Sequence, residues 1–405
     1  MKSIFVFFYL SVTLLGCKPS NNKSLVVTAN PLDASIKGDI LVGASVLNDP
    51  DRFVWGTSVI KDEDKYHMLY STWPCGDSLP AFGDSWVLYS KIAYATSNYP
   101  DRDFKFQKVI LEGRKLSGDS LAWDAQMVHN PHIKKFNNKF YLYYIGSKDP
   151  GKTAMGSPGF NLNKRNRVQQ NQKIGVIEFE NFDDLVSGDF IRPNKPILSP
   201  RTRVKPDNVI NPSPKGTVAK PDNLIVVNPS VVQRPLDGKF LLYFKGNIYT
   251  PYWRGVHGVS ISDNPDGPFK AIDDHVFDIK MEDGKIASAE DPYVWYYNSH
   301  QQFYAVFKDF SGKITEGEPG LAILKSIDGI TWSKPLNPFF MKKELILKNR
   351  DTIKVKHLER PQLLINNDGT PKVLYCAASL VNVGSRKDGS SFNVQIPPNV
   401  IETKN

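Results

Sequence analysis

The sequence predicts an all-β fold, a five-bladed β-propeller of four-stranded antiparallel blades, and two observations support this prediction. One layout recurs five times: a small or polar residue, usually followed by Pro, then a β-rich stretch, a turn and a second β-rich stretch containing aromatic residues. Aromatic residues make up 12% of the 405 residues, which favours strands over helices. Repeated four-stranded units are typical of propeller blades, which close radially and leave only short edges.

The five repeats are predicted to be β-hairpins. Their first strands are expected at residues 55–60, 129–133, 228–232, 290–295 and 359–364, and their second strands at 65–70, 139–144, 239–244, 302–307 and 372–375. A turn rich in Asp, Asn or Gly separates the two strands of each pair, as in hairpins. Third strands are expected at 92–97, 259–263 and 321–326. Two tandem β-sandwiches are the competing architecture, but they would not repeat one hairpin five times.

The N-terminal residues are predicted to lie outside the propeller. Residues 1–16 read as a signal peptide, because a short positive start precedes an apolar run, Ile4 to Leu15, that is too short to span a bilayer. The run ends in Leu-Leu-Gly-Cys17, which resembles the bacterial lipobox, in which the cysteine is lipidated.

Residues 17–30 are then expected to form a polar tether, and residues 31–405 a single propeller catalytic domain. This organisation predicts an exported protein held in a bacterial cell envelope only by the acyl chains on Cys17. A plain secretory signal with an incidental cysteine is the alternative. Two thiols remain, Cys75 and Cys376, and the sequence leaves open whether they pair.

The charge pattern excludes one class of partner and favours another. The net charge is +9, but no basic run or nucleic-acid-binding motif occurs, so no nucleic acid is expected. Two long insertions, 146–173 and 200–223, carry many Lys and Arg residues. They are either solvated loops or a basic rim that attracts a sulfated or uronate-bearing oligosaccharide.

The chemistry is expected where the innermost strands begin. The first strand of each blade lines the axis of a propeller, so the residues before the repeated Pro should converge on one cavity. They are Trp55, Gly56, His129, Asn130, Asn228, Glu290, Asp291, Glu359 and Arg360, with Trp123 and Asp124 just upstream of the second repeat. Carboxylates crowded in a partly dry pocket separate their pKa values, which supplies the acid and the base of glycoside hydrolysis. Trp55 and Trp123 would offer flat faces to sugar rings.

The first strands, and especially Glu290-Asp291-Pro292, resemble glycoside hydrolase family 43 and its relative family 117. The resemblance extends from about Asp49 to Pro397. It implies that Glu290 occupies the place of the general acid. The family's general base would fall where this chain has Trp55-Gly56-Thr57, and its pKa-modulating Asp near Asn228, so two carboxylates are replaced.

The missing base is predicted to come from another carboxylate, first Asp124 and then Asp291 or Glu359. Family 117 enzymes are thought to use a His acid, which brings in His129 or His357. Arg360 is expected to grip a carboxylate or sulfate, and Trp73 and Trp253 to form rim platforms. Each of these residues also has a purely structural alternative. Arg360 would form an ion pair with Glu290 or Glu359, and Asp124 would cap a turn. Asp291 would hold the backbone at the start of its strand, and the histidines would pack in the core.

These residues predict a glycoside hydrolase that removes a terminal sugar from a plant or algal oligosaccharide, exo-acting and inverting. A non-catalytic glycan-binding lipoprotein and a scaffold for protein partners are the alternatives. No nucleophile elbow, P-loop, dinucleotide fingerprint or zinc motif occurs. No cofactor is therefore expected, although a divalent cation in the axial channel is left open.

Overall fold

The computed structural model describes residues 23–281, 283–310, 312–315, 317 and 319–404. The predicted signal peptide, Cys17 and the first part of the predicted tether lie outside these residues.

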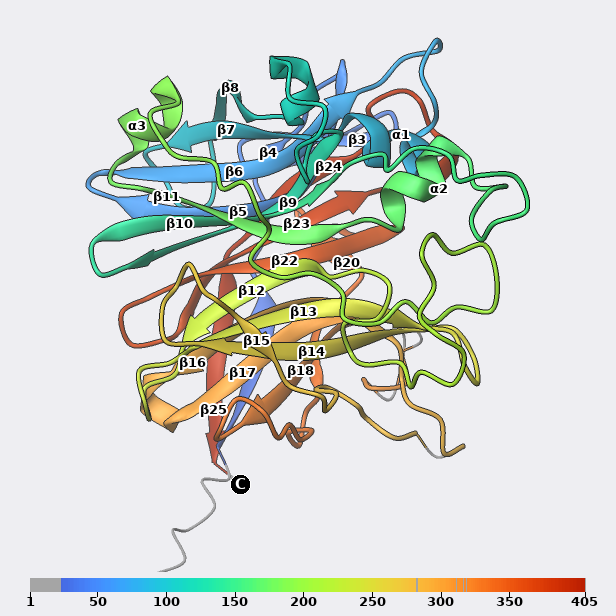
Figure 1. Ribbon diagram of the computed structural model, residues 1–405. Coiled ribbons are helices and arrows are strands. Elements are labelled where there is room, and N and C mark those ends of the chain that lie inside the picture. The colour runs from blue at the N-terminus through green and yellow to red at the C-terminus, as the bar shows by residue number, and fades with distance from the viewer. Residues whose placement is uncertain (1–22, 282, 311, 316, 318, 405) are drawn as a thin grey trace, which may run out of the picture.

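The described strands form a five-bladed propeller, and all five predicted hairpins are confirmed (Figure 1). Blade 1 contains β5 (Arg52–Asp62), β6 (Lys65–Pro74), β7 (Lys91–Ser97) and β8 (Lys105–Leu111). Blade 2 contains β9 (Met127–Phe136), β10 (Lys139–Ser147) and β11 (Lys173–Phe179). Blade 3 contains β12 (Val227–Gln233), β13 (Phe240–Ile248), β14 (Arg254–Ser262) and β15 (Lys270–Ala271). Blade 4 contains β16 (Ala289–Tyr297), β17 (Gln302–Asp309), β18 (Gly320–Ser326) and β19 (Phe339–Lys342).

Blade 5 closes the ring with strands from both ends of the chain. It contains β22 (His357–Ile365), β23 (Pro371–Ser379), β24 (Phe392–Ile396) and the early strand β4 (Val46–Leu47). Four blades have four strands as predicted. Blade 2 has three strands. Leu198 forms an isolated bridge with Ile174 of β11, at the edge where a fourth strand would pair.

The chain ends correct the predicted tether. Residues 23–29, which were expected to belong to it, form β1 (Lys23–Ala29) and pair along their whole length with β25 (Pro398–Lys404) (Figure 1). Leu25 is buried in the same core cluster as residues of blades 4 and 5. The strand forms because its alternating apolar residues can be buried against the propeller. Two further hairpins are β2 (Ser35–Lys37) with β3 (Ile40–Val42), and β20 (Glu344–Ile346) with β21 (Thr352–Lys354).

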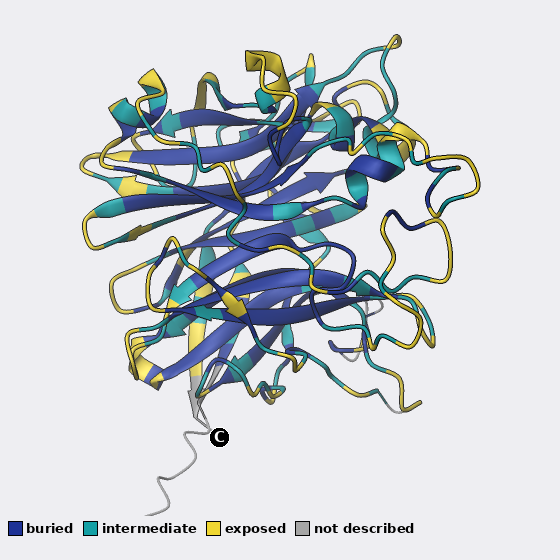
Figure 2. Cartoon of the chain, viewed as in Figure 1, coloured by how far each residue is buried: buried dark blue, intermediate teal, exposed yellow. Residues whose placement is uncertain are grey.

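The blades pack face to face, so their central strands are buried on both sides. Figure 2 shows buried residues along the strands and exposed residues at the turns. The described helices are short: α1 (Phe82–Tyr89), α2 (Lys164–Gln169) and α3 (Phe182–Ser187), with 3₁₀ turns η1 (Arg114–Ser117), η2 (Asn298–His300) and η3 (Val383–Ser385). None of the described helices has the length and apolar character needed to cross a membrane. Helices α1 and α2 are in contact with each other, beside one end of the blades (Figure 1).

Candidate active site

Every innermost strand carries a β-bulge at the same place in its sequence. The bulge residues have left-handed backbone conformations, with φ from 24° to 61°; they are Gly56, Asn130, Asn228, Asp291 and Arg360. Gly, Asn and Asp tolerate positive φ well, which explains four of the five residue types. The repeated Pro directly after four of them fits here, because a bulge leaves the ladder incomplete and Pro has no N–H to donate.

These bulge residues form a hydrogen-bonded layer around the axis. Asn130 Nδ2 donates to Asn228 Oδ1 at 2.9 Å, and Asn228 Nδ2 donates to Asp291 Oδ1 at 2.6 Å. Asp291 Oδ2 accepts the backbone N–H of Arg360 at 3.1 Å. A Cβ on Gly56 would press against Asn130 Oδ1, so the missing side chain in blade 1 leaves the space that Asn130 fills.

A second polar layer lies below the first and links the blades in the same order. It is formed by the side chains two residues after each bulge residue: Ser58, His132, Ser230, Tyr293 and Gln362. The first three accept a backbone N–H from the next blade, at Ile133, Val231 and Val294 respectively. Tyr293 donates its hydroxyl to Leu363 O at 2.8 Å, and Gln362 Oε1 contacts both Ser58 and His132. Buried polar groups therefore fix how the five blades meet.

A cavity of about 480 Å³ opens above the first layer. Its floor includes Asn130, Asn228, Asp291 and Arg360, four of the five bulge residues. Both long insertions contribute to its walls: Leu162, Asn166, Gln169, Gln170 and Gln172 from the first, and Lys205 and Asn208 from the second. The volume lies within the range of ligand pockets. Among the predicted site residues, Trp55, His129, Asn130, Asn228, Glu290, Asp291, Glu359 and Arg360 all line this cavity.

One side of the cavity is aromatic. Trp55 and Trp73 from blade 1 and Phe82 and Trp86 from α1 line it, and their rings pack edge to face or tilted. His129 lies between the Trp73 and Trp86 rings, with centroids 5.7 and 4.8 Å away. Trp73 is fully buried, whereas Trp86 is only partly buried and can present a flat face to the apolar face of a sugar ring.

The side of the cavity formed by blades 3, 4 and 5 carries charged side chains, and these form ion pairs with one another. Glu290 on β16 contacts the Lys245 ammonium on β13, and its other oxygen lies 3.9 Å from Lys308 Nζ on β17. Lys308 Nζ also lies 2.6 Å from Glu359 Oε1 on β22, which accepts from His357 Nδ1 at 2.8 Å. Positive and negative groups thus alternate across blades 3, 4 and 5.

These contacts determine the protonation of the carboxyl groups. Burial opposes the ionisation of Glu290, but Lys245 and Lys308 outweigh it and lower its pKa. Burial likewise opposes the ionisation of Glu359, but His357 and Lys308 lower its pKa to about 2. Burial and the neighbouring Glu290 charge raise the pKa of Asp291 to about 6, against the effect of Arg360. Asp291 also receives hydrogen bonds from blades 3 and 5, which is the bracing role that the sequence left open.

The two candidate histidines differ in their surroundings. His129 lines the cavity, contacts Ser90 Oγ through Nδ1 at 2.8 Å, and has a pKa well below its usual value because of burial and the Arg360 charge. His357 lies behind Glu359 and does not line the cavity; its ring centroid is 6.2 Å from that of Trp55. The Nε2 atom of His357 is buried and has no hydrogen-bond partner among the described residues. His129 is therefore held neutral, and His357 is oriented by a carboxylate.

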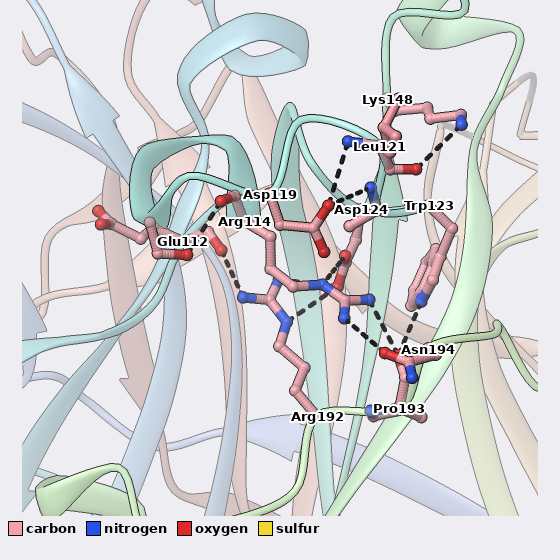
Figure 3. Close-up of polar contacts among 12 residues, drawn as sticks. Glu112, Arg114, Asp119, Leu121, Trp123, Asp124, Lys148, Arg192, Pro193 and Asn194 are labelled. Atoms are coloured by element: carbon pink, nitrogen blue, oxygen red, sulfur yellow. Dashed lines mark hydrogen bonds and ion pairs between the residues drawn. The ribbon is translucent and has the colours of Figure 1, made fainter.

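The placement of Asp124 and Trp123 corrects the expectation that they reach the channel mouth. Asp124 is fully buried outside the cavity, between Arg114 Nε at 2.6 Å and Arg192 Nη2 at 2.8 Å (Figure 3). Tyr144 donates a further hydrogen bond to it at 2.8 Å. Trp123 packs on the Tyr144 ring and donates its indole N–H to Pro193 O. Both residues hold the loops beside blade 2 in place, and neither lines the cavity.

The basic residues of the insertions are also largely occupied. Arg167 is paired with Asp149, Arg165 with Asp84, and Arg201 with both Asp222 and Asp273. Lys205 lines the cavity, with its ammonium 5.4 Å from the Tyr249 ring centroid, and none of the described acidic groups pairs with it. The predicted basic rim is therefore reduced, at the cavity itself, to Lys205.

Sequence reasoning missed Lys245, Lys308 and Trp86. The two lysines lie on second strands, whereas most of the predicted site residues lie on first strands. Each directly follows an aromatic residue, Phe244 or Phe307, near the end of an apolar strand, and a lone lysine there was the available signal. Trp86 lies on α1, a helix of eight residues that was not among the expected elements.

Comparisons of the whole chain support the fold. No protein-family model matches the chain, and no curated protein matches it. Among solved structures, a glycoside hydrolase matches with a TM-score of 0.58 at 13% identity, over 88% of this chain and 90% of its own. A family 117 glycoside hydrolase from the marine bacterium Zobellia galactanivorans matches with a TM-score of 0.53 at 16% identity, over 93% and 91%. The catalytic domain of a family 62 α-L-arabinofuranosidase from Coprinopsis cinerea gives 0.51 at 12% identity, over 87% and 95%. The chain thus shares the propeller fold of these glycoside hydrolases.

Among the described residues, no group of three or more His, Cys, Asp or Glu side chains is placed to hold a metal ion. The charge beside Asp291 on the axis is the Arg360 guanidinium, 3.5 Å away. Neither Cys75 nor Cys376 forms a disulfide bond with a described residue.

Proposed function

We propose that this protein is a glycoside hydrolase that removes a terminal sugar from a plant or algal oligosaccharide. One observation carries the proposal: a single cavity at the mouth of the axis combines the carboxylates of Glu290 and Glu359 with the indoles of Trp55 and Trp86. Carboxylates supply the acid–base chemistry of glycoside hydrolysis, and the indoles supply stacking for a sugar ring.

Exo-action fits the walls of the cavity. The insertion residues Gln169, Gln170 and Lys205 stand on one side and α1 on another, so the substrate enters a pocket rather than an open cleft. The amide groups of Gln169 and Gln170 are suited to hydrogen bonds with sugar hydroxyls. A pocket accepts the end of a chain more readily than its middle, so we expect one monosaccharide per cleavage.

We assign the base to Glu290. Glu290 is ionised by its two lysines, which suits a group that activates water and does not suit a proton donor. His357 lies outside the cavity lining, so its part in this proposal is to hold the Glu359 carboxylate through Nδ1. A base that activates water gives inversion of the anomeric centre.

An anionic substrate is part of this proposal. Lys245 and Arg360 in the cavity are already paired with carboxylates, whereas Lys205 is paired with none of the described ones. Lys205 is therefore the group we expect to contact a sulfate or uronate. Neutral and sulfated forms of one oligosaccharide should differ in KM for the protein and much less for a K205M variant.

The test is incubation with plant and algal oligosaccharides, followed by separation of the products and NMR of the first anomer formed. We expect release of a monosaccharide of inverted configuration. E290Q should abolish turnover and leave oligosaccharide binding intact. An unchanged rate for E290Q would remove Glu290 from the mechanism.

A second candidate, a non-catalytic glycan-binding protein, is favoured by Gly56 and Asn228. The family 43 resemblance implies one carboxylate within Trp55-Gly56-Thr57 and another near Asn228, and this chain has none at either place. Binding of oligosaccharides without any cleavage, at a concentration of protein well above that of substrate, would support this candidate.

We also propose that Cys17 anchors the protein in a bacterial cell envelope through its acyl chains. The lipobox-like run before Cys17 supports this, and the short segment 18–22 would serve as the tether. Metabolic labelling with an alkyne fatty acid should mark the native protein and spare C17A. Equal labelling of both would exclude lipidation at this cysteine.

A further inference from the structure

Lys308 occupies an unusual position between two carboxylates. It lies directly across the β16–β17 ladder from Glu290, and its ammonium also reaches Glu359 in the next blade. The side chains are largely shielded from water, at 12% exposure for Lys308 and 13% for Glu359. Lys308 Nζ lies 3.9 Å from Glu290 Oε2 and 2.6 Å from Glu359 Oε1. The distance between these two carboxylate oxygens therefore cannot exceed the sum of the two distances.

Two carboxylates this close in a dry site do not normally ionise together. Their repulsion leaves one proton shared by the pair unless a cation lies between them. Lys308 is that cation: although burial opposes its charge, Glu359 and Glu290 raise the pKa of its ammonium. Other charged groups around the pair are Lys245 on β13, Asp291 on β16, His357 and Arg360 on β22, and Lys343 after β19.

We propose that Lys308 is a positioning residue that allows Glu290 and Glu359 to be ionised side by side. The inference rests on the proposed function only for its kinetic consequence. Glu290 acts as a base and not as an acid because Lys308, together with Lys245 on the far side of Glu290, prevents the pair from retaining a proton. The leaving-group proton must then come from outside the pair.

If Lys308 only held blades 4 and 5 together, its removal would have a different effect. Its removal would lower stability equally at every pH. If Lys308 sets the charge of the pair, K308M should instead bind a proton near neutral pH, because one glutamate then has a folded-state pKa above its unfolded value.

The test is thermal unfolding of the full chain between pH 5 and 8. The raised pKa of Asp291 makes the stability of both proteins fall as pH rises toward 6. In K308M, stability should fall further as pH rises through the raised pKa of the pair, whereas the pair gives the wild type no such slope. Infrared spectra at pH 7 should show a protonated carboxyl band in K308M that is absent from the wild type. A K308M variant without this band and without the slope would overturn the proposal.

Two further variants separate the protonation of the pair from a general loss of stability in K308M. K308M/E359Q removes one carboxylate and should lose both the slope and the band. Lys139 offers a matched control, because it also bridges two carboxylates, Glu178 at 2.6 Å and Glu180 at 3.1 Å, but at 40% exposure in water. K139M should show neither effect. Should K308M fail to fold, K308Q with the same infrared measurement replaces it.

The outcomes separate this inference from the proposed function. If the wild type hydrolyses no glycan but K308M takes up a proton, the charge role stands and the hydrolase proposal fails. If the wild type is a hydrolase and K308M takes up no proton, the hydrolase proposal stands and the charge role of Lys308 fails. If both stand, the acidic limb of the kcat/KM profile should move upward by at least about one pH unit in K308M, a tenfold change in proton affinity.

Discussion

The two halves of the axial mouth share one backbone design and differ in chemistry. Blades 1 to 3 place Gly56, Asn130 and Asn228 at their bulges, beside an aromatic wall, and none of these three carries a charge. Blades 4 and 5 place Asp291 and Arg360 at the same positions, next to the paired glutamates. The fold therefore supplies five equivalent positions around the axis, and the residue at each bulge decides which of them bears a charge.

Backbone conformation explains part of this difference. Positive φ is easily adopted by Gly, Asn and Asp, which occupy four bulges, but it strains a long side chain such as that of Arg360 by about 1–3 kcal/mol. Arg360 tolerates the strain because Asp291 accepts both its backbone N–H and its guanidinium. The charged half is thus more interdependent than the neutral half.

The largest expected effect breaks that interdependence. R360M would leave Asp291 buried without its cation, and removal of one partner from a buried pair typically costs about 3–5 kcal/mol. The matched change on the neutral side, N228A, removes hydrogen bonds but no charge and should cost about 1–3 kcal/mol, part of it from the Asp291 oxygen left without a donor. Urea unfolding of both variants measures the difference, and equal losses would show that charge is not what distinguishes the two halves.

The next effect separates chemistry from binding. E359Q should lower kcat about 100-fold, because the cavity loses a carboxylate that holds both Lys308 and His357. W86A, on the aromatic side, should mainly raise KM, by roughly tenfold, because one stacking face is removed. Steady-state kinetics on a cleaved oligosaccharide checks both. A W86A variant that loses kcat as severely as E359Q would contradict a division of labour between the two sides.

Gly56 sharpens the comparison further. G56A adds a Cβ that presses on Asn130 Oδ1 and forces Ala into a left-handed conformation, which we expect to cost about 1–3 kcal/mol. N130G in the same chain should recover the steric part of this loss. If G56A is as stable as the wild type in urea, the complementarity of Gly56 and Asn130 is not what holds the neutral half together.

The sequence was sufficient for the hairpins and for most of the cavity floor, for a local reason. Each hairpin is encoded by adjacent residues: a turn signal, an apolar run and a Pro after the bulge. Asp124 was misplaced because its partners Arg114 and Arg192 lie on other segments of the chain, and only folding shows that they enclose it. Lys308 was missed because its importance depends on Glu359, which comes from the following blade.

The smallest expected effect is a pH dependence with opposite signs at two neighbouring carboxyl groups. The pKa of Glu359 is lowered to about 2, so its contribution to stability is present above its unfolded pKa and is lost as pH falls toward 2. The pKa of Asp291 is raised to about 6, so its folded form binds a proton more tightly than the unfolded chain, and stability falls as pH rises from about 4 to about 6. Unfolding temperatures measured from pH 2 to 8 should therefore decline less on the acid side in E359Q and less between pH 4 and 6 in D291N. Since both groups lie in the charged half, N228A should keep both slopes; if it removes either one, the neutral half helps to set the ionisation of the charged half.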